Sequence, residues 1–271
     1  VNYRKSVAEA GDCAAIEWRG RGATLYDNFG NAYLDFLGGY GALDLGWSHP
    51  EVVEVVRAQA GKSGIPSQEL MDPLRGVMAK LMAEITPGDI DHAFFVGSGT
   101  EAVEGALKIA RLHTGKHSFI STVKAFHGKT SGSLSVMGKK AFRAPLQPYG
   151  AQIYFVPFGD AHALEQQLEI CNAVGIEIAG FVAEPIQGEA GAIVPPDDYW
   201  PRVREICTRH GILMICDEVQ TGLGRTGALW GVDHWKVAPD IMMAAKSLGG
   251  GVMPIGCFMG NGDIWKSLEE P

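Results

Sequence analysis

The sequence contains few cysteines, and no two of them are spaced as in a redox motif or a metal site. The five are Cys13, Cys171, Cys207, Cys216 and Cys257, an odd number with no Cys-x-x-Cys motif. Disulfide-stabilised folds and zinc clusters need pairs or close groups of cysteines. The pattern argues against both classes and predicts reduced thiols in a cytoplasmic protein without a bound metal.

Positive charge and long apolar runs are also scarce. Lysine and arginine number 23 against 31 aspartates and glutamates, a net charge of −8, whereas a surface that binds a phosphate backbone needs the opposite excess. No apolar stretch approaches the ~18–20 residues that span a bilayer, and the amino terminus lacks the apolar core of a secretory signal. We therefore expect neither nucleic acid nor a membrane among the partners.

Hydrophobic residues (46%) and glycine (36 of 271 residues) are abundant, which is the composition of a globular protein with a substantial core. Two short alternating pieces between residues 23 and 36 flank Asn28-Phe29-Gly30-Asn31 and predict a hairpin. Helices are expected after Pro50, over 72–85 and over 199–210, the last between an Asp198 N-cap and Gly211.

Seven short apolar runs alternate with helical segments. Continuous apolar runs of this kind are typical of strands buried on both faces of a parallel sheet. The runs are 93–96, 119–120, 153–156, 178–183, 212–216, 241–244 and 255–259. They predict an α/β fold whose mainly parallel sheet lies between helices. Residues 48–271 are expected to form one large domain, and residues 1–47 a segment of a second, smaller one.

Three of these runs lead directly into residues that carry chemistry. Glu184 follows the run at 178–183, Asp217 the run at 212–216, and Lys246 the run that begins at 241. In open α/β sheets ligands bind beyond the carboxyl ends of the strands. The two acids and the lysine are therefore expected along one rim of the sheet.

A phosphate-binding turn is expected after the first run. Residues 93–96 lead into Gly97-Ser98-Gly99-Thr100-Glu101 and then a helix, and Ser98 with Glu101 fits a capping box. Small residues at a helix N-terminus let backbone N–H groups approach an anion. Taken alone, the pattern fits an ordinary strand-to-helix turn somewhat better than a phosphate site.

Lys246 is the candidate nucleophile. It lies just before Gly249-Gly250-Gly251, where close approach of neighbouring groups would leave its amine poorly hydrated. Desolvation lowers the pKa of a lysine and frees the amine for Schiff-base chemistry. A phosphate-binding turn, such a lysine and the strand-end Asp217 are the three parts needed to hold pyridoxal phosphate.

Five motifs, in this order, make the chain resemble the class III, fold-type I aminotransferases, which depend on pyridoxal phosphate. They are SGTEA from Ser98, FHG from Phe126, EPIQGE from Glu184, DEVQTGLGRTG from Asp217 and KSLGGG from Lys246. The resemblance runs through nearly the whole chain, and residues 67–75 and 249–256 look especially like those of putrescine aminotransferases. It implies a fold-type I transferase with a mixed, mainly parallel sheet sandwiched by helices.

The resemblance also implies a role for each cofactor residue. Lys246 would bond to the aldehyde of the cofactor and move the substrate proton, and Asp217 would keep the ring nitrogen protonated. The other expected cofactor-binding residues are Phe126 and Val219 on the two ring faces, Gln220 at the phenolic oxygen, Ser98, Gly99 and Thr100 at the phosphate, and Glu184.

The residue after the Phe-His-Gly motif narrows the substrate. Family members that act on α-amino acids carry an arginine there, whereas this chain has Lys129, which cannot make the same planar two-bond contact with a carboxylate. A diamine fits better, with Glu189 as the partner of its distal ammonium and Tyr40 as an aromatic wall. The expected reaction is a ping-pong transfer from a diamine, putrescine first, to a keto acid such as 2-oxoglutarate, a step of polyamine degradation.

Two alternatives remain open. One is another class III activity, of the acetylornithine, ornithine or 4-aminobutyrate type, or an aminomutase. The other is a catalytically inactive, truncated chain that serves only to dimerise, because family members continue past Pro271 into the rest of the large domain and a carboxy-terminal small domain. The resemblance implies at least a homodimer, with cofactor pockets at the subunit boundary.

Overall fold

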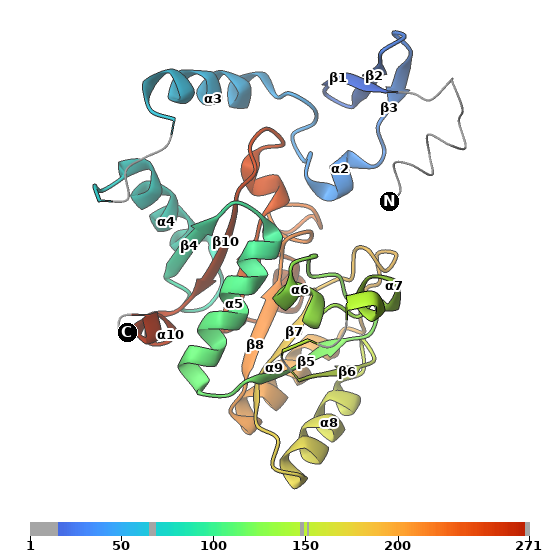
Figure 1. Ribbon diagram of the computed structural model, residues 1–271, viewed down its shortest axis with the longest axis vertical. Coiled ribbons are helices and arrows are strands. Elements are labelled where there is room, and N and C mark those ends of the chain that lie inside the picture. Colours follow the sequence, from blue (N-terminus) through green and yellow to red (C-terminus); the bar gives the residue numbers. More distant parts are fainter. Residues whose placement is uncertain (1–15, 65–68, 147–148, 151, 269–271) are drawn as a thin grey trace.

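The computed structural model describes residues 16–64, 69–146, 149–150 and 152–268. Its centre is a seven-stranded sheet in the order β4-β10-β9-β8-β7-β5-β6 (Figure 1). The strands are β4 (His92–Val96), β5 (Ser118–Thr122), β6 (Ile153–Val156), β7 (Ile178–Ala183), β8 (Leu213–Asp217), β9 (Ile241–Ala244) and β10 (Gly256–Gly260). The strand pairs are parallel except those of β10, which is antiparallel to both β4 and β9. The predicted α/β fold and all seven predicted strands are confirmed.

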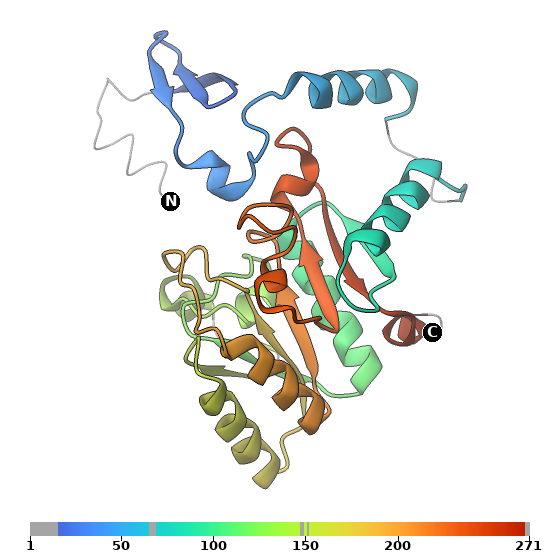
Figure 2. The ribbon, with the colours of Figure 1, turned by 180° about the vertical axis from the view of Figure 1, so that it is seen from behind.

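Helices cover both faces of this sheet. Figure 1 shows α5 (Gly99–Thr114) on one face, and Figure 2 shows α8 (Ala161–Ala173) and α9 (Tyr199–His210) on the other. Side chains of one strand alternate between the two layers: Ile241 and Met243 of β9 pack in the core cluster of α5, and Met242 and Ala244 in that of α8 and α9. Burial on both faces explains why the strands read as continuous apolar runs.

The remaining helical elements are short or peripheral. They are α2 (Gly38–Gly41), α3 (Pro50–Lys62), α4 (Pro73–Ile85), α6 (Ser131–Ser135), α7 (Lys140–Arg143), α10 (Gly262–Trp265) and the 3-10 turns η2 (Ala144–Leu146), η3 (Gly231–Trp235), η4 (Lys246–Gly249) and η5 (Lys266–Leu268). The predicted helices α3 and α4 are confirmed, and Asp72 caps α4 by accepting from the Leu74 N–H at 3.0 Å. The apolar stripe of α3 is not buried in this chain, and Val55 is exposed.

A second, three-stranded antiparallel sheet precedes the main one. It consists of β1 (Glu17–Arg21), β2 (Thr24–Asp27) and β3 (Ala32–Leu34), and the predicted hairpin is the β2–β3 pair. Asp27 holds the turn by accepting from the N–H groups of Phe29 and Asn31, both at 2.9 Å. Figure 1 shows this sheet and α3 at the same end of the molecule, far from α8. The division into two domains at residue 47 stays a prediction.

One predicted cap is wrong. The carboxylate of Asp198 makes no capping hydrogen bond to α9, because its backbone is already helical (φ −85, ψ −6) and an N-cap needs an extended backbone to fold its side chain back. Asp198 instead pairs with Arg202 at 3.4 Å. The predicted end of the helix is confirmed, since Gly211 adopts the left-handed conformation with φ 58.

The cysteines of the described residues are free and buried: Cys171, Cys207, Cys216 and Cys257. Burial raises the pKa of the Cys207 and Cys257 thiols to about 12, which keeps them protonated and unreactive. Cys13 lies outside the described residues. Within those residues no helix has the length and apolar character that crossing a membrane requires. That the protein works in the cytoplasm stays a prediction.

Candidate active site

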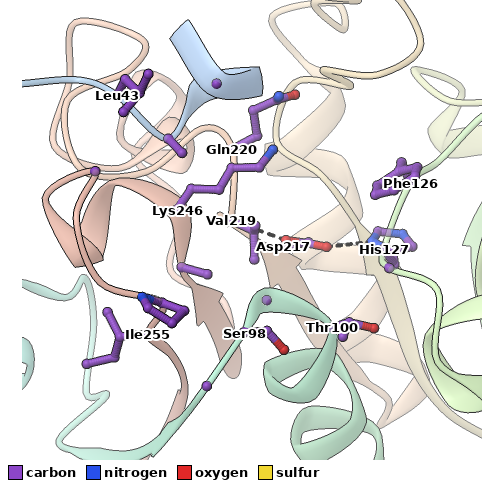
Figure 3. Close-up of a pocket in the computed structure, with 18 of the residues that line it drawn as sticks. Leu43, Ser98, Thr100, Phe126, His127, Asp217, Val219, Gln220, Lys246 and Ile255 are labelled. Atoms are coloured by element: carbon purple, nitrogen blue, oxygen red, sulfur yellow. Dashed lines mark hydrogen bonds and ion pairs between the residues drawn. The ribbon is translucent and has the colours of Figure 1, made fainter. Parts of the chain in front are cut away.

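A cavity of about 640 Å³ lies where β7, β8 and β9 end and α5 begins (Figure 3). Eleven of the twelve site residues expected from the sequence line it. They are Ser98, Gly99, Thr100, Phe126, Lys129, Glu184, Glu189, Asp217, Val219, Gln220 and Lys246. The carboxyl ends of parallel strands meet at one edge of a sheet, so three motifs far apart in sequence converge here.

The Lys246 side chain extends into this cavity from the end of β9, toward Gln220 (Figure 3). Burial lowers the pKa of its ammonium, while attraction to Asp217, Glu189 and Glu184 opposes that shift. A lowered pKa increases the fraction of neutral amine, the form that attacks a carbonyl carbon. The surroundings of Lys246 therefore suit a nucleophile.

Asp217 is held by two donors at the end of β8. Its Oδ2 lies 2.7 Å from His127 Nδ1, and its Oδ1 accepts from the Val219 N–H at 3.0 Å. Burial alone would lower the pKa of His127, but the hydrogen bond to Asp217 and the attraction of Asp217 and Glu184 raise it overall. A histidine favoured in its charged form pairs with the carboxylate and holds it in position.

His127 is a site residue that the sequence analysis did not assign. The residue lies inside the Phe-His-Gly motif, and its ring is fully buried against Asp217. A titratable side chain between Phe126 and Gly128 was the available signal. Its partner could not be found from spacing, because Asp217 lies 90 residues further along the chain.

Glu184 braces the wall of the cavity that carries Phe126. Its two oxygens accept from the N–H groups of Phe126 and Gly188, each at 3.0 Å. Burial raises the pKa of this carboxyl, and nearby His127 partly offsets the rise. Glu184 thus holds the backbone of the aromatic residue in place.

The expected phosphate-binding turn has free backbone donors at the start of α5. Ser98 caps the helix as predicted, accepting from the Glu101 N–H at 3.3 Å, and its hydroxyl donates to the Glu101 carboxylate at 3.0 Å. The hydroxyl of Thr100 is used elsewhere, since it lies 2.7 Å from Ser133 Oγ and accepts from the Lys129 N–H. The first N–H groups of a helix lack intrahelical acceptors, so Gly99 and Thr100 can offer backbone rather than side-chain donors to an anion.

These residues fit the cofactor that the resemblance implies. His127 Nε2 and Gln220 Oε1 are buried without a hydrogen-bond partner, and such groups are costly unless a ligand or water satisfies them. A methyl group on Gly99 would lie 2.9 Å from Val219 Cγ1, so glycine is needed for the helix to approach the ring-stacking residue. In the described part of the chain, no three His, Cys, Asp or Glu side chains are grouped so as to hold a metal ion.

The expected substrate residues have different outcomes. Tyr40 does not line the cavity: its side chain is 57% exposed, and its backbone carbonyl accepts from Gln220 Nε2 at 2.7 Å. Tyr40 has a left-handed backbone (φ 56), and in this chain it does not form the expected aromatic wall. The Lys129 ammonium lies over the rings of Phe126 and Phe142, 5.8 and 4.9 Å from their centroids.

Glu189 already has a partner at the cavity. Lys139 donates to its backbone carbonyl at 2.6 Å and pairs with its Oε2 at 3.3 Å. Lys139 is a second residue that the sequence analysis did not assign, and it lies 50 residues before Glu189. A cationic substrate group that binds Glu189 has to share the carboxylate with this lysine.

Glu218 is a buried carboxyl beside the cavity whose titration should be measurable. It accepts from the Thr221 hydroxyl and from the N–H groups of Gly231 and Val232, both at 2.9 Å. Burial raises its pKa from 4.5 to about 7. The folded protein therefore holds this proton more tightly than the unfolded chain, so the stability it contributes is present below pH 4.5 and is lost as the pH rises to about 7.

The Glu218→Gln variant should remove this pH dependence. The difference in unfolding free energy between the parent and the variant should fall by about 2–3 kcal/mol between about pH 5 and about pH 8.5, measured by urea denaturation at each pH. Glu165→Gln is the control, because Glu165 pairs with Arg209 at the surface, 2.6 Å away, and should give a flat difference. A flat difference for Glu218→Gln as well would contradict the assignment.

Comparisons with known proteins agree with this geometry. The family model "Aminotransferase class-III" matches residues 7–271. The chain is 48% identical to the putrescine aminotransferase of Pectobacterium atrosepticum, an alignment that covers 100% of this chain and 58% of that protein.

Solved structures of similar fold extend the comparison. The ornithine aminotransferase of Toxoplasma gondii is 33% identical, with a TM-score of 0.88 over 98% of this chain and 64% of that one. An (S)-enantioselective omega-transaminase from Thermomicrobium roseum is 31% identical, with a TM-score of 0.90 over 98% of this chain and 64% of that one. The chain spans less than two thirds of the length of each of these relatives.

Proposed function

The chain belongs to the class III aminotransferases, which depend on pyridoxal phosphate, and we propose that it transfers the amino group of a diamine, putrescine first, to a keto acid such as 2-oxoglutarate. The observation that carries the proposal is that Lys246, Asp217 and the first residues of α5 all line the same cavity. The similarity to a putrescine aminotransferase supports the diamine over the other class III substrates, the aminomutases and an inactive scaffold.

Each wall of the cavity has a part in holding the cofactor. The backbone N–H groups of Gly99 and Thr100, with the Ser98 side chain nearby, would bind the phosphate. Phe126 and Val219 would enclose the ring, and Lys246 would form the covalent link. Gln220 and Glu184 complete the set at the phenolic side of the ring.

When bound, pyridoxal phosphate supplies an electron sink that stabilises negative charge on the carbon next to the substrate nitrogen. The residues of the chain control protons and charge around it. The Asp217 carboxylate, held 2.7 Å from His127, would favour a proton on the ring nitrogen. The Lys246 amine, with its lowered pKa, would take the proton from the substrate carbon and return it.

The mouth of the cavity favours a donor without an α-carboxylate. Lys129 offers a single ammonium that already lies over two aromatic rings, and it cannot make the two parallel hydrogen bonds that an arginine makes to a carboxylate. Glu189 supplies negative charge for a distal ammonium.

The test of the proposed function is a donor comparison on the purified chain. The chain is mixed with pyridoxal phosphate, its absorbance is recorded, and glutamate is measured after adding 2-oxoglutarate with putrescine, ornithine, N-acetylornithine or 4-aminobutyrate. Putrescine should give the highest kcat/KM. A faster reaction with one of the amino acids would favour the other class III activities. Isomerisation of a donor without any keto acid would indicate an aminomutase, and the absence of a bound-cofactor band would favour the scaffold.

The Glu189→Gln variant should weaken the binding of putrescine selectively. Removing the carboxylate loses a charged contact with the distal ammonium and leaves the Lys139 cation uncompensated, so KM for putrescine should rise about tenfold. Butylamine lacks the distal ammonium and is the matched control, so its KM should change less than about threefold. Equal increases for both amines would show that Glu189 acts on the site in general rather than on the second charge.

We also propose a homodimer or larger homo-oligomer. The exposed side of α4 and the segment before it present a row of large apolar side chains. The row consists of Leu70, Met71, Leu74, Val77 and Leu81. Apolar groups gathered on a surface in this way mark an interface, and a second copy of the chain is the proposed occupant.

A further inference from the structure

The carboxylate of Asp44 joins two segments that are far apart in the sequence. Its Oδ1 forms an ion pair with Arg225 Nη2, and its Oδ2 accepts a hydrogen bond from the Ser247 hydroxyl. The Ser247 hydroxyl also lies 3.2 Å from the carbonyl oxygen of Gly41. Asp44 is mostly shielded from solvent, with its side chain 18% exposed.

Ser247 directly follows Lys246, whose backbone is strained. Lys246 has a left-handed backbone conformation with φ 50, which residues other than glycine rarely adopt. Such a conformation persists only when the surrounding structure imposes it. The hydrogen bond from Ser247 to Asp44 acts on the residue next to the strained one.

The segment that carries Asp44 also packs closely against the loop that follows Lys246. A methyl group on Gly251 would lie 2.8 Å from Leu43 Cδ2, and one on Gly250 would lie 3.0 Å from Val52 Cγ1. Gln220, which lies next to the Lys246 side chain in Figure 3, donates to the Tyr40 carbonyl. Residues 40–52 therefore contact both Gln220 and the loop after Lys246.

We propose that Asp44 is a positioning residue for Lys246, which it holds through Ser247 while Arg225 orients its carboxylate. The inference rests on the proposed function in one respect, that Lys246 is the reactive amine. In this proposal, the segment that carries Asp44, just after α2, fixes the backbone from which the Lys246 side chain extends.

The ion pair between Asp44 and Arg225 also affects the pKa of Lys246. The guanidinium of Arg225 lowers the pKa of the Lys246 ammonium, and the Asp44 carboxylate neutralises that guanidinium at contact distance. Other charged groups that act on Lys246 are Asp217, Glu189 and Glu184, all of which raise its pKa. Loss of Asp44 should therefore shift the Lys246 titration to lower pH.

Amide hydrogen exchange on the chain without cofactor tests the positioning role directly. Asp44→Ala should speed exchange in residues 246–252 by roughly tenfold, the effect of losing a charged hydrogen bond. Asp44→Asn keeps an acceptor for Ser247 and should have a smaller effect. Glu165→Gln, which removes a surface ion pair on α8, is the control and should leave residues 246–252 unchanged.

A double variant separates positioning from general loosening. If Asp44 acts through Ser247, Asp44→Ala combined with Ser247→Ala should exchange no faster at 246–252 than Ser247→Ala alone. Additive effects, or faster exchange confined to residues 38–47 in Asp44→Ala, would overturn the proposal. Ser247→Ala loses only a hydroxyl, so it remains informative if Asp44→Ala fails to fold.

A second readout reports on the amine. The pH midpoint for labelling of Lys246 with an amine-reactive reagent, read by mass spectrometry, should move lower in Asp44→Ala and stay unchanged in Glu165→Gln. An unchanged midpoint together with unchanged exchange would overturn the proposal. Both readouts use the chain without cofactor or substrates, so they stand even if the proposed aminotransferase activity is not found.

Discussion

Replacing Lys246 by alanine is expected to abolish the covalent link to pyridoxal phosphate and to reduce kcat by about 10⁴-fold. Lys246 has three properties of a nucleophile. Its side chain lines the cavity, burial lowers the pKa of its ammonium, and the Asp217 carboxylate interacts with its charge. The primary measurement is a titration of the variant with pyridoxal phosphate, in which the near-visible absorbance of the lysine-bound cofactor should not appear.

Lys124→Ala is a matched control for this variant. Lys124 has the same unusual backbone, with φ 70, but it is exposed and does not line the cavity. Replacing it tests the cost of putting alanine at a left-handed position without touching the candidate nucleophile. A Lys246→Ala variant that kept the absorbance band would show that another amine forms the link.

The Asp217→Asn variant should have the second largest effect, a fall in kcat of about 10³-fold. Asparagine keeps the shape and can still accept from the Val219 N–H, but it carries no charge to stabilise a protonated ring nitrogen. It also deprives His127 of its ion partner at 2.7 Å, so the pKa of His127 should fall. The measurements are kcat with putrescine and the pH dependence of the absorbance of the bound cofactor.

His127→Gln is the comparison for Asp217→Asn. It removes one donor to Asp217 but leaves the carboxylate and the Val219 N–H in place, so kcat should fall only about tenfold to a hundredfold. Equal losses in the two variants would mean that the histidine, and not the carboxylate charge, carries the effect. A loss of less than threefold in Asp217→Asn would remove Asp217 from the proposed chemistry.

The secondary structure of the main sheet was predictable because its signals are local. The run 178–183 is apolar throughout since β7 is buried on both faces, and glycine at 211 ends α9 in a left-handed conformation that few other residues adopt. The N-cap at Ser98 was equally readable. Asp198 was not predictable in the same way: its residue type suits a cap, but its backbone is already helical, and the sequence pattern did not reveal those dihedrals.

Two features of the candidate site depended on tertiary contacts and could not be predicted. Tyr40 was expected as a wall of the cavity, but it is largely exposed, and Gln220, 180 residues further along the chain, binds its backbone carbonyl. Thr100 was expected at the phosphate, and the structure adds that Ser133 and the backbone of Lys129 engage its hydroxyl, which leaves its backbone N–H for an anion. In both cases the contacts that decide the outcome come from residues distant in the sequence.

The sequence by itself determined which residues end the strands of this sheet, and hence that an acid and a lysine face one cavity, because burial patterns and turn residues act over a few positions. Only the tertiary structure decided how those residues are paired. Asp217 meets His127 across 90 residues, and Asp44 meets Ser247 across 203. The physical reason is that hydrogen bonds and ion pairs act over a few ångströms in space, and the crossovers between strands, rather than spacing along the chain, bring those atoms together.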